Sequence, residues 1–456
     1  MPSRLLESHL ATARFLLIIC GILFPGLAIG QDEFAVSELP NAPVTSRFND
    51  AFFRSDRLGW IVNGDGEIFQ TTDGGSSWNL QFVQSDAHFR SVAFLTDQHG
   101  FAGNVGPGEF GATDPNLLYE TTDGGATWLP VSAISGPAPG GICGMYVVND
   151  TTIVAVGRVR GPAFFLRTTD AGRTWVSHDL SEYAAGLIDA HFTHPDTGFV
   201  AGLSDANHTL SSGIVLKTED GGATWVRKHI TPRQGEWIWK LSFPSRRVGY
   251  ASLQRNSGAP IDIVKTVDGG ESWTEMRFLD TYYFVQGIGF IDELNGWIGG
   301  NSTDPVYMTD DGGQTWRAEQ LRPRLNRFRF LGDSLGYAVG RTVHRIRRIP
   351  QTGPDAIEKN GFRLSAAWPN PASRGITIRY ELPSDGPVRL DVVDASGRTL
   401  QTIVDRQRSA GVYAATWDGR VADGGTAASG TYFITMTASD IRDQTTRLTQ
   451  SVVVVR

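Results

Sequence analysis

Cysteine is almost absent from this chain of 456 residues, which has one at position 20 and one at position 143. If the N-terminal segment is removed, Cys143 is alone and no internal disulfide can form, so a large core or repetition must hold an exported form together. Residues 34–350 show no helical period, which excludes a helix bundle. A formal net charge of −7 provides no concentrated basic face for nucleic acid.

The first 30 residues differ from the rest. Arg4 and Arg14 precede an apolar run from Phe15 to Gly30, and small residues stand where a signal peptidase requires them. We predict a secretory signal peptide over residues 1–30, cut before Gln31. A lipoprotein anchor at Cys20 is disfavoured, because Ile19 occupies a place that requires a small residue. No other apolar run of about 20 residues exists, so we expect no transmembrane segment after cleavage.

An eight-letter phrase, T-T-D-G-G-A-T-W at 121–128, occurs six times in slightly varied form with a period of about 45 residues. Such a period is typical of propellers, solenoids and arrays. The aspartates and tryptophans of the six copies are Asp73 and Trp78, Asp123 and Trp128, Asp170 and Trp175, Asp220 and Trp225, Asp268 and Trp273, and Asp311 and Trp316.

A second pattern precedes each copy, in which an aromatic residue is followed six positions later by a small residue that opens a short apolar strand. It occurs seven times, and the last occurrence has no copy of the phrase after it: Phe53 and Gly59, Phe94 and Gly100, Tyr146 and Thr152, Phe192 and Gly198, Phe243 and Gly249, Phe290 and Gly296, and Phe330 and Gly336. Each unit reads as four short antiparallel strands with Gly and Asp turns. We therefore predict an all-β fold with a seven-bladed β-propeller over residues 31–350.

The seventh unit supplies only three strands, and an open ring would expose a sheet edge. We predict that residues 34–40 provide the missing strand by pairing with residues 342–347.

The repeated phrase suits a structural clip. Its aspartate can accept hydrogen bonds from backbone N–H groups of its own turn, and the glycine two positions later permits a positive φ. We expect its tryptophan to bury against the next blade. Catalysis would require six near-identical active sites, and one carboxylate per turn is too few for calcium. We accordingly predict no catalytic residue, no metal site and no cofactor.

The repeated phrase lies on one face of the propeller, and the links between second and third strands lie on the other. We expect a ligand on this second face, because its links vary widely in length, whereas the turns on the face of the repeated phrase are constant. The first strand of each unit should line the central channel. The residues three positions before the aromatic residues form a mixed polar row, which either contacts a ligand or lines a water-filled channel. They are Asp50, Ser91, Cys143, Asp189, Lys240, Gly287 and Arg327. As candidate binding residues we take Arg90, Asp189, Lys240 and Arg327.

The C-terminal part has a different organisation. Residues 351–361 form a short polar linker, and residues 362–456 contain alternating strands such as I-T-I-R-Y-E-L and T-Y-F-I-T-M-T, separated by the turns D-A-S-G-R and W-D-G-R. About 95 residues with this pattern predict an immunoglobulin-like β-sandwich.

Both parts resemble known families. The eight-letter phrase resembles the Asp-box, or BNR repeat, of sialidases, xyloglucan hydrolases and sortilin-type receptors; with G-W-I-V and G-W-I-G in second strands, residues 48–350 most resemble photosystem II assembly and stability factors. Residues 362–456 resemble flagellar-hook-cap Ig-like domains and type IX secretion (Por) sorting domains, through Pro369-Asn370-Pro371, Gly397-Arg398, Trp417-Asp418-Gly419, Ser429-Gly430-Thr431-Tyr432 and the basic Arg456.

These resemblances imply an exported, monomeric, non-catalytic propeller that binds a protein or a cell-surface glycan through its variable-loop face. The tail implies contact with a type IX secretion system and a secreted or outer-surface location in a Gram-negative, Bacteroidetes-like bacterium. A secreted glycoside hydrolase of sialidase or xyloglucanase type is the alternative. Its sialidase form is disfavoured because Arg348-Ile349-Pro350 follows the last blade instead of preceding the first.

Overall fold

The computed structural model describes residues 33–300, 305–319, 324–349, 357–367, 370–372, 375–422, 424–440 and 444–455. The predicted signal peptide, its cleavage site, Pro369 and Arg456 lie outside these residues. The described part is built from β-strands, and it contains no helix long and apolar enough to cross a membrane.

Seven of the described sheets form the blades, and in each the four main strands alternate in direction; they follow chain order in every blade except the seventh, whose outer strand comes from the N-terminal end of the propeller. Blades 1 to 3 are β2 (Phe48–Phe53), β3 (Gly59–Asn63), β4 (Glu67–Thr71) and β5 (Asn79–Val83); β6 (Phe89–Phe94), β7 (Gly100–Asn104), β8 (Leu118–Thr121) and β9 (Leu129–Pro130); and β11 (Gly144–Asn149), β12 (Thr152–Gly157), β13 (Phe164–Thr168) and β14 (Trp175–Asp179), to which β10 (Ile134–Ser135) adds a parallel fifth strand.

Blades 4 to 7 are β15 (Gly186–Phe192), β16 (Gly198–Leu203), β17 (Gly213–Thr218) and β18 (Val226–Ile230); β19 (Glu236–Ser242), β20 (Gly249–Arg255), β21 (Ile261–Thr266) and β22 (Thr274–Leu279); β23 (Val285–Phe290), β24 (Gly296–Gly300), β25 (Val306–Thr309) and β26 (Arg317–Glu319); and β27 (Arg327–Leu331), β28 (Leu335–Val339), β29 (Val343–Ile349) and β1 (Glu33–Glu38).

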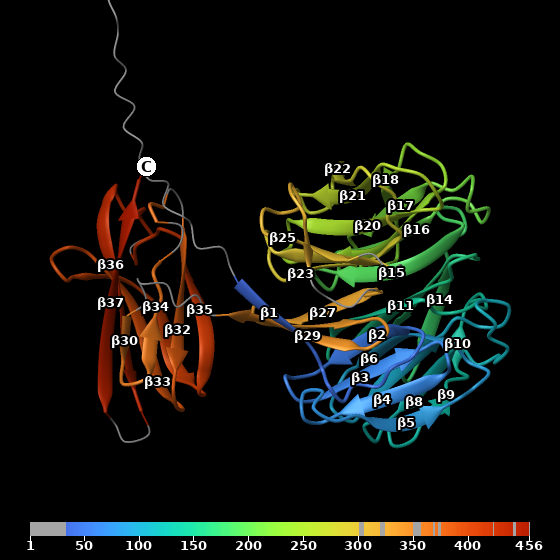
Figure 1. Cartoon of the computed structure of the whole chain (residues 1–456), viewed down its shortest axis with the longest axis horizontal. Coiled ribbons are helices and arrows are strands. Elements are labelled where there is room, and N and C mark those ends of the chain that lie inside the picture. The colour runs from blue at the N-terminus through green and yellow to red at the C-terminus, as the bar shows by residue number, and fades with distance from the viewer. Residues whose placement is uncertain are drawn as a thin grey trace, which may run out of the picture. The chain divides into compact units, whose positions relative to one another are not determined.

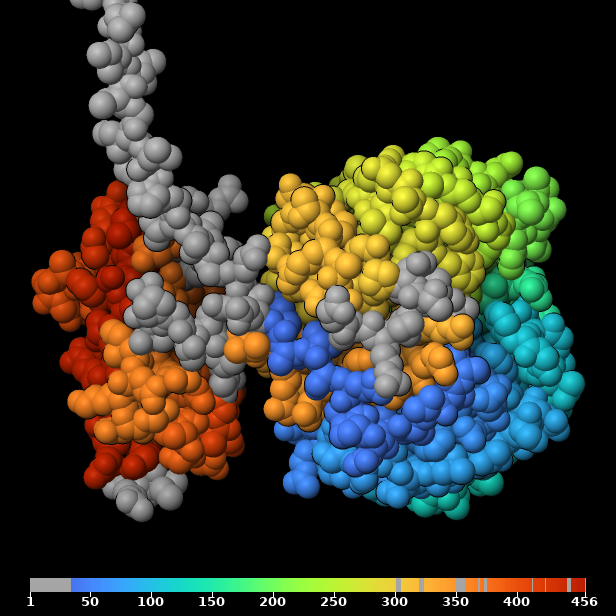
Figure 2. Space-filling view, viewed as in Figure 1, coloured from blue at the N-terminus to red at the C-terminus, as the bar shows by residue number. Residues whose placement is uncertain are grey.

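The first strand of every blade contacts the first strands of both neighbouring blades, so the seven sheets form a closed ring around a central channel. Closure depends on β1, which pairs antiparallel with β29 from Glu33 opposite Ile349 to Glu38 opposite His344. The pairing predicted from sequence is confirmed. Figure 1 shows β1, in blue, beside the orange β29, and Figure 2 shows blue and orange atoms adjoining on the surface.

The spacing of six between aromatic and glycine has a steric cause. In six repeats the ring of the first-strand aromatic lies so close to the glycine that an added Cβ would fall 2.3–2.5 Å from a ring atom. The residue after the glycine then stacks on the aromatic of the next blade: Trp60 on Phe94 and Tyr250 on Phe290, each at 3.5 Å. Tyr337 stacks on Phe53 at 3.5 Å across the closure.

The repeated phrase forms the same turn in all six blades. The aspartate accepts a backbone N–H and a hydroxyl from the Ser or Thr four positions later, with hydroxyl distances of 2.5–2.7 Å. These hydrogen bonds, first among them the one from the Ser or Thr hydroxyl, lower the pKa of Asp73, Asp123 and Asp170 to about 2. The turn thereby joins the third and fourth strands.

The expectation that the phrase's tryptophan packs against the next blade is wrong, because the partner is the preceding blade. Trp175 of blade 3 lies 5.4 Å from Phe101 of blade 2, between ring centroids, and Trp225 of blade 4 lies 5.1 Å from Phe165 of blade 3. The second glycine of the phrase explains the direction, since an added Cβ on Gly172 would fall 2.2 Å from Phe101. The turn therefore also fastens a blade that carries it to the blade before it.

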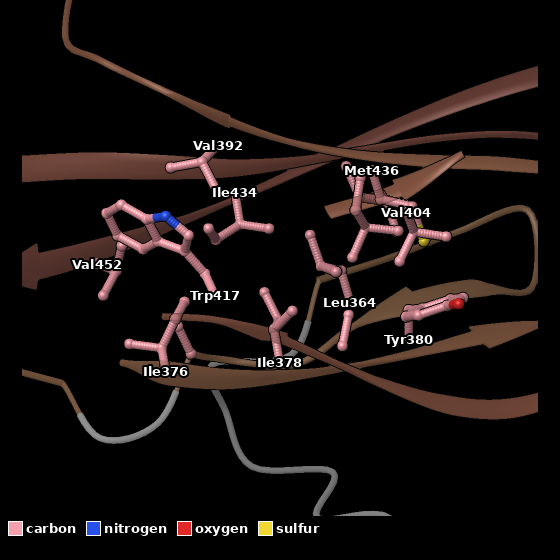
Figure 3. Close-up of a cluster of buried hydrophobic side chains, with 14 of the residues drawn as sticks. Leu364, Ile376, Ile378, Tyr380, Val392, Val404, Trp417, Ile434, Met436 and Val452 are labelled. Carbon is pink, nitrogen blue, oxygen red and sulfur yellow. The ribbon is translucent and has the colours of Figure 1, made fainter. Parts of the chain in front are cut away.

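The C-terminal residues form two further sheets. One has the order β30 (Ile357–Lys359), β31 (Phe362–Leu364), β32 (Ile376–Leu382) and β35 (Gly411–Trp417), and the other has the order β34 (Thr399–Arg408), β33 (Gly386–Val393), β36 (Gly430–Ser439) and β37 (Thr445–Val454). Side chains from both sheets fill the space between them, with Trp417, Ile378 and Ile434 at its centre (Figure 3). This is the expected β-sandwich.

Candidate functional site: the central channel

The polar row predicted from sequence lies inside the channel. Asp50, Asp189, Lys240 and Arg327 are each at most 3 % exposed. Arg327 of blade 7 donates to Asp50 of blade 1 (Nε–Oδ1, 2.9 Å) and, across the channel, to both oxygens of Asp189 of blade 4 (2.8 and 3.0 Å). Arg329 also donates to both Asp50 oxygens, at 3.0 Å. These residues close the middle of the channel with charge pairs.

Each of the two carboxylates also accepts a hydrogen bond from a backbone N–H in the first strand of the following blade. Asp50 accepts the N–H of Val92 at 3.3 Å, and Asp189 accepts that of Leu241 at 3.0 Å. Burial opposes ionisation of Asp189, but Arg327 and Lys240 outweigh it and hold its pKa well below the usual range. A general acid for glycoside hydrolysis needs a raised pKa. Asp189 therefore does not supply one.

Lys240 is less well paired. Its ammonium lies 3.6 Å from Asp189 Oδ1 and has no hydrogen-bond partner among the described residues. Burial, together with the charge of Arg327, lowers the pKa of Lys240 to about 7. The same part of the chain contains no group of three or more His, Cys, Asp or Glu side chains that could hold a metal ion.

A β-bulge adds a second row of side chains to the channel. In five blades the pairing of first and second strands skips the residue four positions before the aromatic: Asn49, Arg90, Ile188, Trp239 and Gln286. A bulge interrupts alternation and re-aims a side chain. As a result Arg90 of blade 2 meets Trp239 of blade 5, with its guanidinium 5.1 Å from the indole centroid, although these blades are not neighbours.

Arg90 and Trp239 belong to the loop-side mouth, the channel end bordered by the links between second and third strands. Arg47 lies 5.9 Å from the same indole, so two guanidiniums share one aromatic surface. Neither has a carboxylate within ion-pair distance in the described chain, and the Nε of each lacks a hydrogen-bond partner there. Burial lowers the pKa of Arg90, and burial and Arg90 together lower that of Arg47. Two buried guanidiniums at this mouth thus lack a paired carboxylate, an arrangement that is energetically unfavourable.

The clip-side mouth, the channel end bordered by the repeated turns, has a different character. A pocket of about 260 Å³ there is lined by Phe52, Phe53, Met145, Tyr146, Val147, Arg329, Phe330 and Leu331. Phe52, Met145 and Arg329 stand one position before the first-strand aromatic, two after the polar row. Strand alternation could have revealed this row from sequence.

The four sequence candidates thus divide between two clusters. Asp189, Lys240 and Arg327 form the charge pairs in the middle of the channel, whereas Arg90 belongs to the loop-side mouth. Sequence reasoning missed Arg47 and Trp239. A bulge leaves no clear mark in a sequence, and Arg47 precedes the first strand of its blade, so neither residue stands three positions before a first-strand aromatic.

Comparisons with known proteins agree with this architecture. The family described as photosynthesis system II assembly factor YCF48 matches residues 30–178, and the FlgD Ig-like domain family matches residues 371–441. The photosystem II assembly lipoprotein Ycf48 of Synechococcus sp. (strain CC9902) is 30 % identical over 157 residues, which cover 33 % of this chain and 41 % of the relative. The chain therefore matches about two fifths of that relative's length.

The chloroplastic photosystem II stability/assembly factor HCF136 of Arabidopsis thaliana is 22 % identical over 320 residues, covering 64 % of this chain and 72 % of the relative. Among solved structures, YCF48 bound to a D1 peptide superimposes with a TM-score of 0.52 and 19 % identity, covering 70 % of this chain and 97 % of that one. That structural likeness supports the propeller fold.

Proposed function

Because the chain carries a propeller of the YCF48/HCF136 BNR type and a C-terminal FlgD Ig-like domain, we propose that it is an exported, non-catalytic protein that binds a polypeptide through the loop-side mouth of its channel. The observation that carries this proposal is the pair of unpaired guanidiniums, Arg47 and Arg90, on the indole of Trp239. A YCF48 protein has been solved with a bound peptide, which supports a peptide as the ligand class.

The chemistry of this mouth defines what the peptide must contain. Arg90 is 2 % exposed, and a buried guanidinium without a counter-charge is costly unless an anion joins it. A carboxylate can accept two parallel N–H bonds from one guanidinium. Trp239 offers an apolar surface for the adjoining part of the chain. The ligand is therefore an acidic segment of a polypeptide.

The test is an array of synthetic peptides that carry Glu, Gln or no polar side chain at a central position, probed with mature protein (residues 31–456). We expect binding to the Glu peptides and at least tenfold weaker binding by Arg90→Gln and Arg47→Gln. Arg227→Gln, at an exposed site on β18, is the matched control and should bind like wild type. Equal binding by all four proteins would contradict the proposal.

The two ends of the chain support a proposal on location. A signal peptide over residues 1–30 would direct export, and the FlgD Ig-like match overlaps the motifs that resemble type IX sorting domains. We place the protein outside the cell or on the outer surface of a Gram-negative, Bacteroidetes-like bacterium. A truncated chain lacking residues 362–456 should then accumulate in the periplasm, as measured by fractionation, and its continued appearance in the medium would contradict sorting by this domain.

A further inference from the structure

The loop between β7 and β8 of blade 2, residues 105–117, covers the loop-side mouth. Both of its ends are fixed. Near the end, Asp114 accepts the Tyr119 hydroxyl at 2.6 Å, and its N–H donates to Asp86 at 3.0 Å. Near the start, Arg158 of blade 3 donates to the Pro107 carbonyl at 2.7 Å.

The loop tip is less firmly held than its ends. Gly108 and Gly111 both have φ +85°, and a Cβ on either would meet nothing within 4 Å, so these glycines border open space. Only Gly108 N–H to Ala112 (3.0 Å) and Ala112 N–H to Glu109 (2.8 Å) close the tip on itself. Ala112 belongs to the buried core cluster that includes Trp239, so the part that can move without disturbing the anchored ends is residues 108–111.

The tip nevertheless places two side chains against the cation site. Glu109 is 1 % exposed, and its negative charge partly offsets the lowering of the Arg90 pKa by burial. Phe110 lies 5.3 Å from the Arg90 guanidinium and stacks on His88 at 5.2 Å. This acidic-aromatic pair lies where a ligand would have to lie to reach Arg90.

The fit of the pair is poor. Glu109 is not within ion-pair distance of Arg90, and its Oε2 has no hydrogen-bond partner among the described residues. Phe110 adopts φ 47°, which is rare for a bulky residue, and remains 44 % exposed. A buried carboxylate oxygen without a partner is unfavourable, so exposing Glu109 to water removes that part of the cost of its burial.

We infer that Glu109 and Phe110 are an internal substitute for the ligand, and that the natural partner is a polypeptide with a carboxylate next to an aromatic residue, which displaces this tip. The inference rests on the proposed function and adds both the ligand's chemistry and its regulation. Because the closed tip competes with the ligand, apparent affinity is reduced by the fraction of open molecules. Only a partner that pairs with Arg90 more closely than Glu109 does can open the site.

The test uses mature protein and three labelled eight-residue peptides with Glu-Phe, Gln-Phe or Glu-Ala at the centre, followed by fluorescence anisotropy. We expect Glu-Phe to bind best and the double variant Glu109→Gln/Phe110→Ala to bind it at least tenfold more tightly than wild type. Glu182→Gln, at an exposed site, is the control and should leave affinity unchanged. Hydrogen exchange at residues 108–112 should accelerate when the Glu-Phe peptide is added to wild type.

The outcomes separate the two proposals. If peptides bind and Arg90→Gln abolishes binding, but the double variant has wild-type affinity and exchange at 108–112 is unchanged, the inference about the tip is overturned while the binding function stands. If Gln-Phe or Glu-Ala binds as well as Glu-Phe, the inferred ligand chemistry is wrong. If no protein, including the double variant, binds any of the peptides, both proposals fail together.

Discussion

Two buried arginines illustrate how different surroundings give one residue type opposite roles. Arg327 pairs with Asp50 and Asp189, whereas Arg90 has no carboxylate partner in the described chain. We predict that Arg327→Met lowers the free energy of unfolding by about 3–5 kcal/mol, because it leaves two buried carboxylates short of their cation. Arg90→Met should cost no stability. Urea denaturation followed by circular dichroism measures both, and an equal loss for the two variants would show that Arg90 is a structural residue.

Lys240 makes the stability of the propeller depend on pH. Its pKa is about 7 in the folded protein, against roughly 10.4 in an unfolded chain. Between these values the unfolded chain binds one more proton than the native chain, so the free energy of unfolding rises with pH. We expect wild type to gain stability relative to Lys240→Met between pH 7 and pH 9, measured as the difference in urea midpoints. A constant difference across that range would mean that Lys240 keeps its ordinary pKa.

At the scale of the element, the glycine six positions after the first-strand aromatic, present in six of the seven blades, couples a strand to the neighbouring blade. A Cβ on Gly296 would fall 2.5 Å from the ring of Phe290, which stacks on Tyr250 of the preceding blade. Gly296→Ala should therefore displace the ring and destabilise the protein by about 1–3 kcal/mol. Gly430→Ala is the control, because in β36 the nearest atom is 4.0 Å away. Equal denaturation midpoints for the two variants would contradict this steric account.

Repetition explains why the blades could be predicted and much of the site could not. Seven copies of one spacing identify the blades even where single strands are ambiguous, and the copy at Phe330 and Gly336 revealed the blade without the repeated phrase. Trp239 enters the channel only because of a bulge, which depends on how two strands pair. The contact of Glu109 and Phe110 with the mouth depends on how one long loop folds. In the C-terminal part, the pairing of β34 with β33 is interrupted by two register shifts, which the sequence pattern alone does not reveal.

At the scale of the whole molecule, the ring is closed by a single strand, β1, whose partner β29 lies about three hundred residues later in the chain. Ordering so long a chain segment between two pairing strands carries a large loop-closure entropy. We call the pairing of β1 with β29 the seam of the ring. Separation of the two strands frees the edges of both and removes the link that holds blade 1 to blade 7. We therefore expect unfolding to begin between β1 and β29.

A disulfide across the seam tests this expectation. Ser37 lies directly opposite Arg345, and their side chains are exposed and half-buried, respectively; directly opposed residues of antiparallel strands are close enough for a cross-link. Ser37→Cys/Arg345→Cys should raise the free energy of unfolding by about 2–4 kcal/mol when oxidised and return to the wild-type value on reduction. Cys143 is fully buried and should not compete, and Ser37→Cys alone is the control. An oxidised double variant that unfolds at the wild-type urea concentration would show that the ring first fails at another blade.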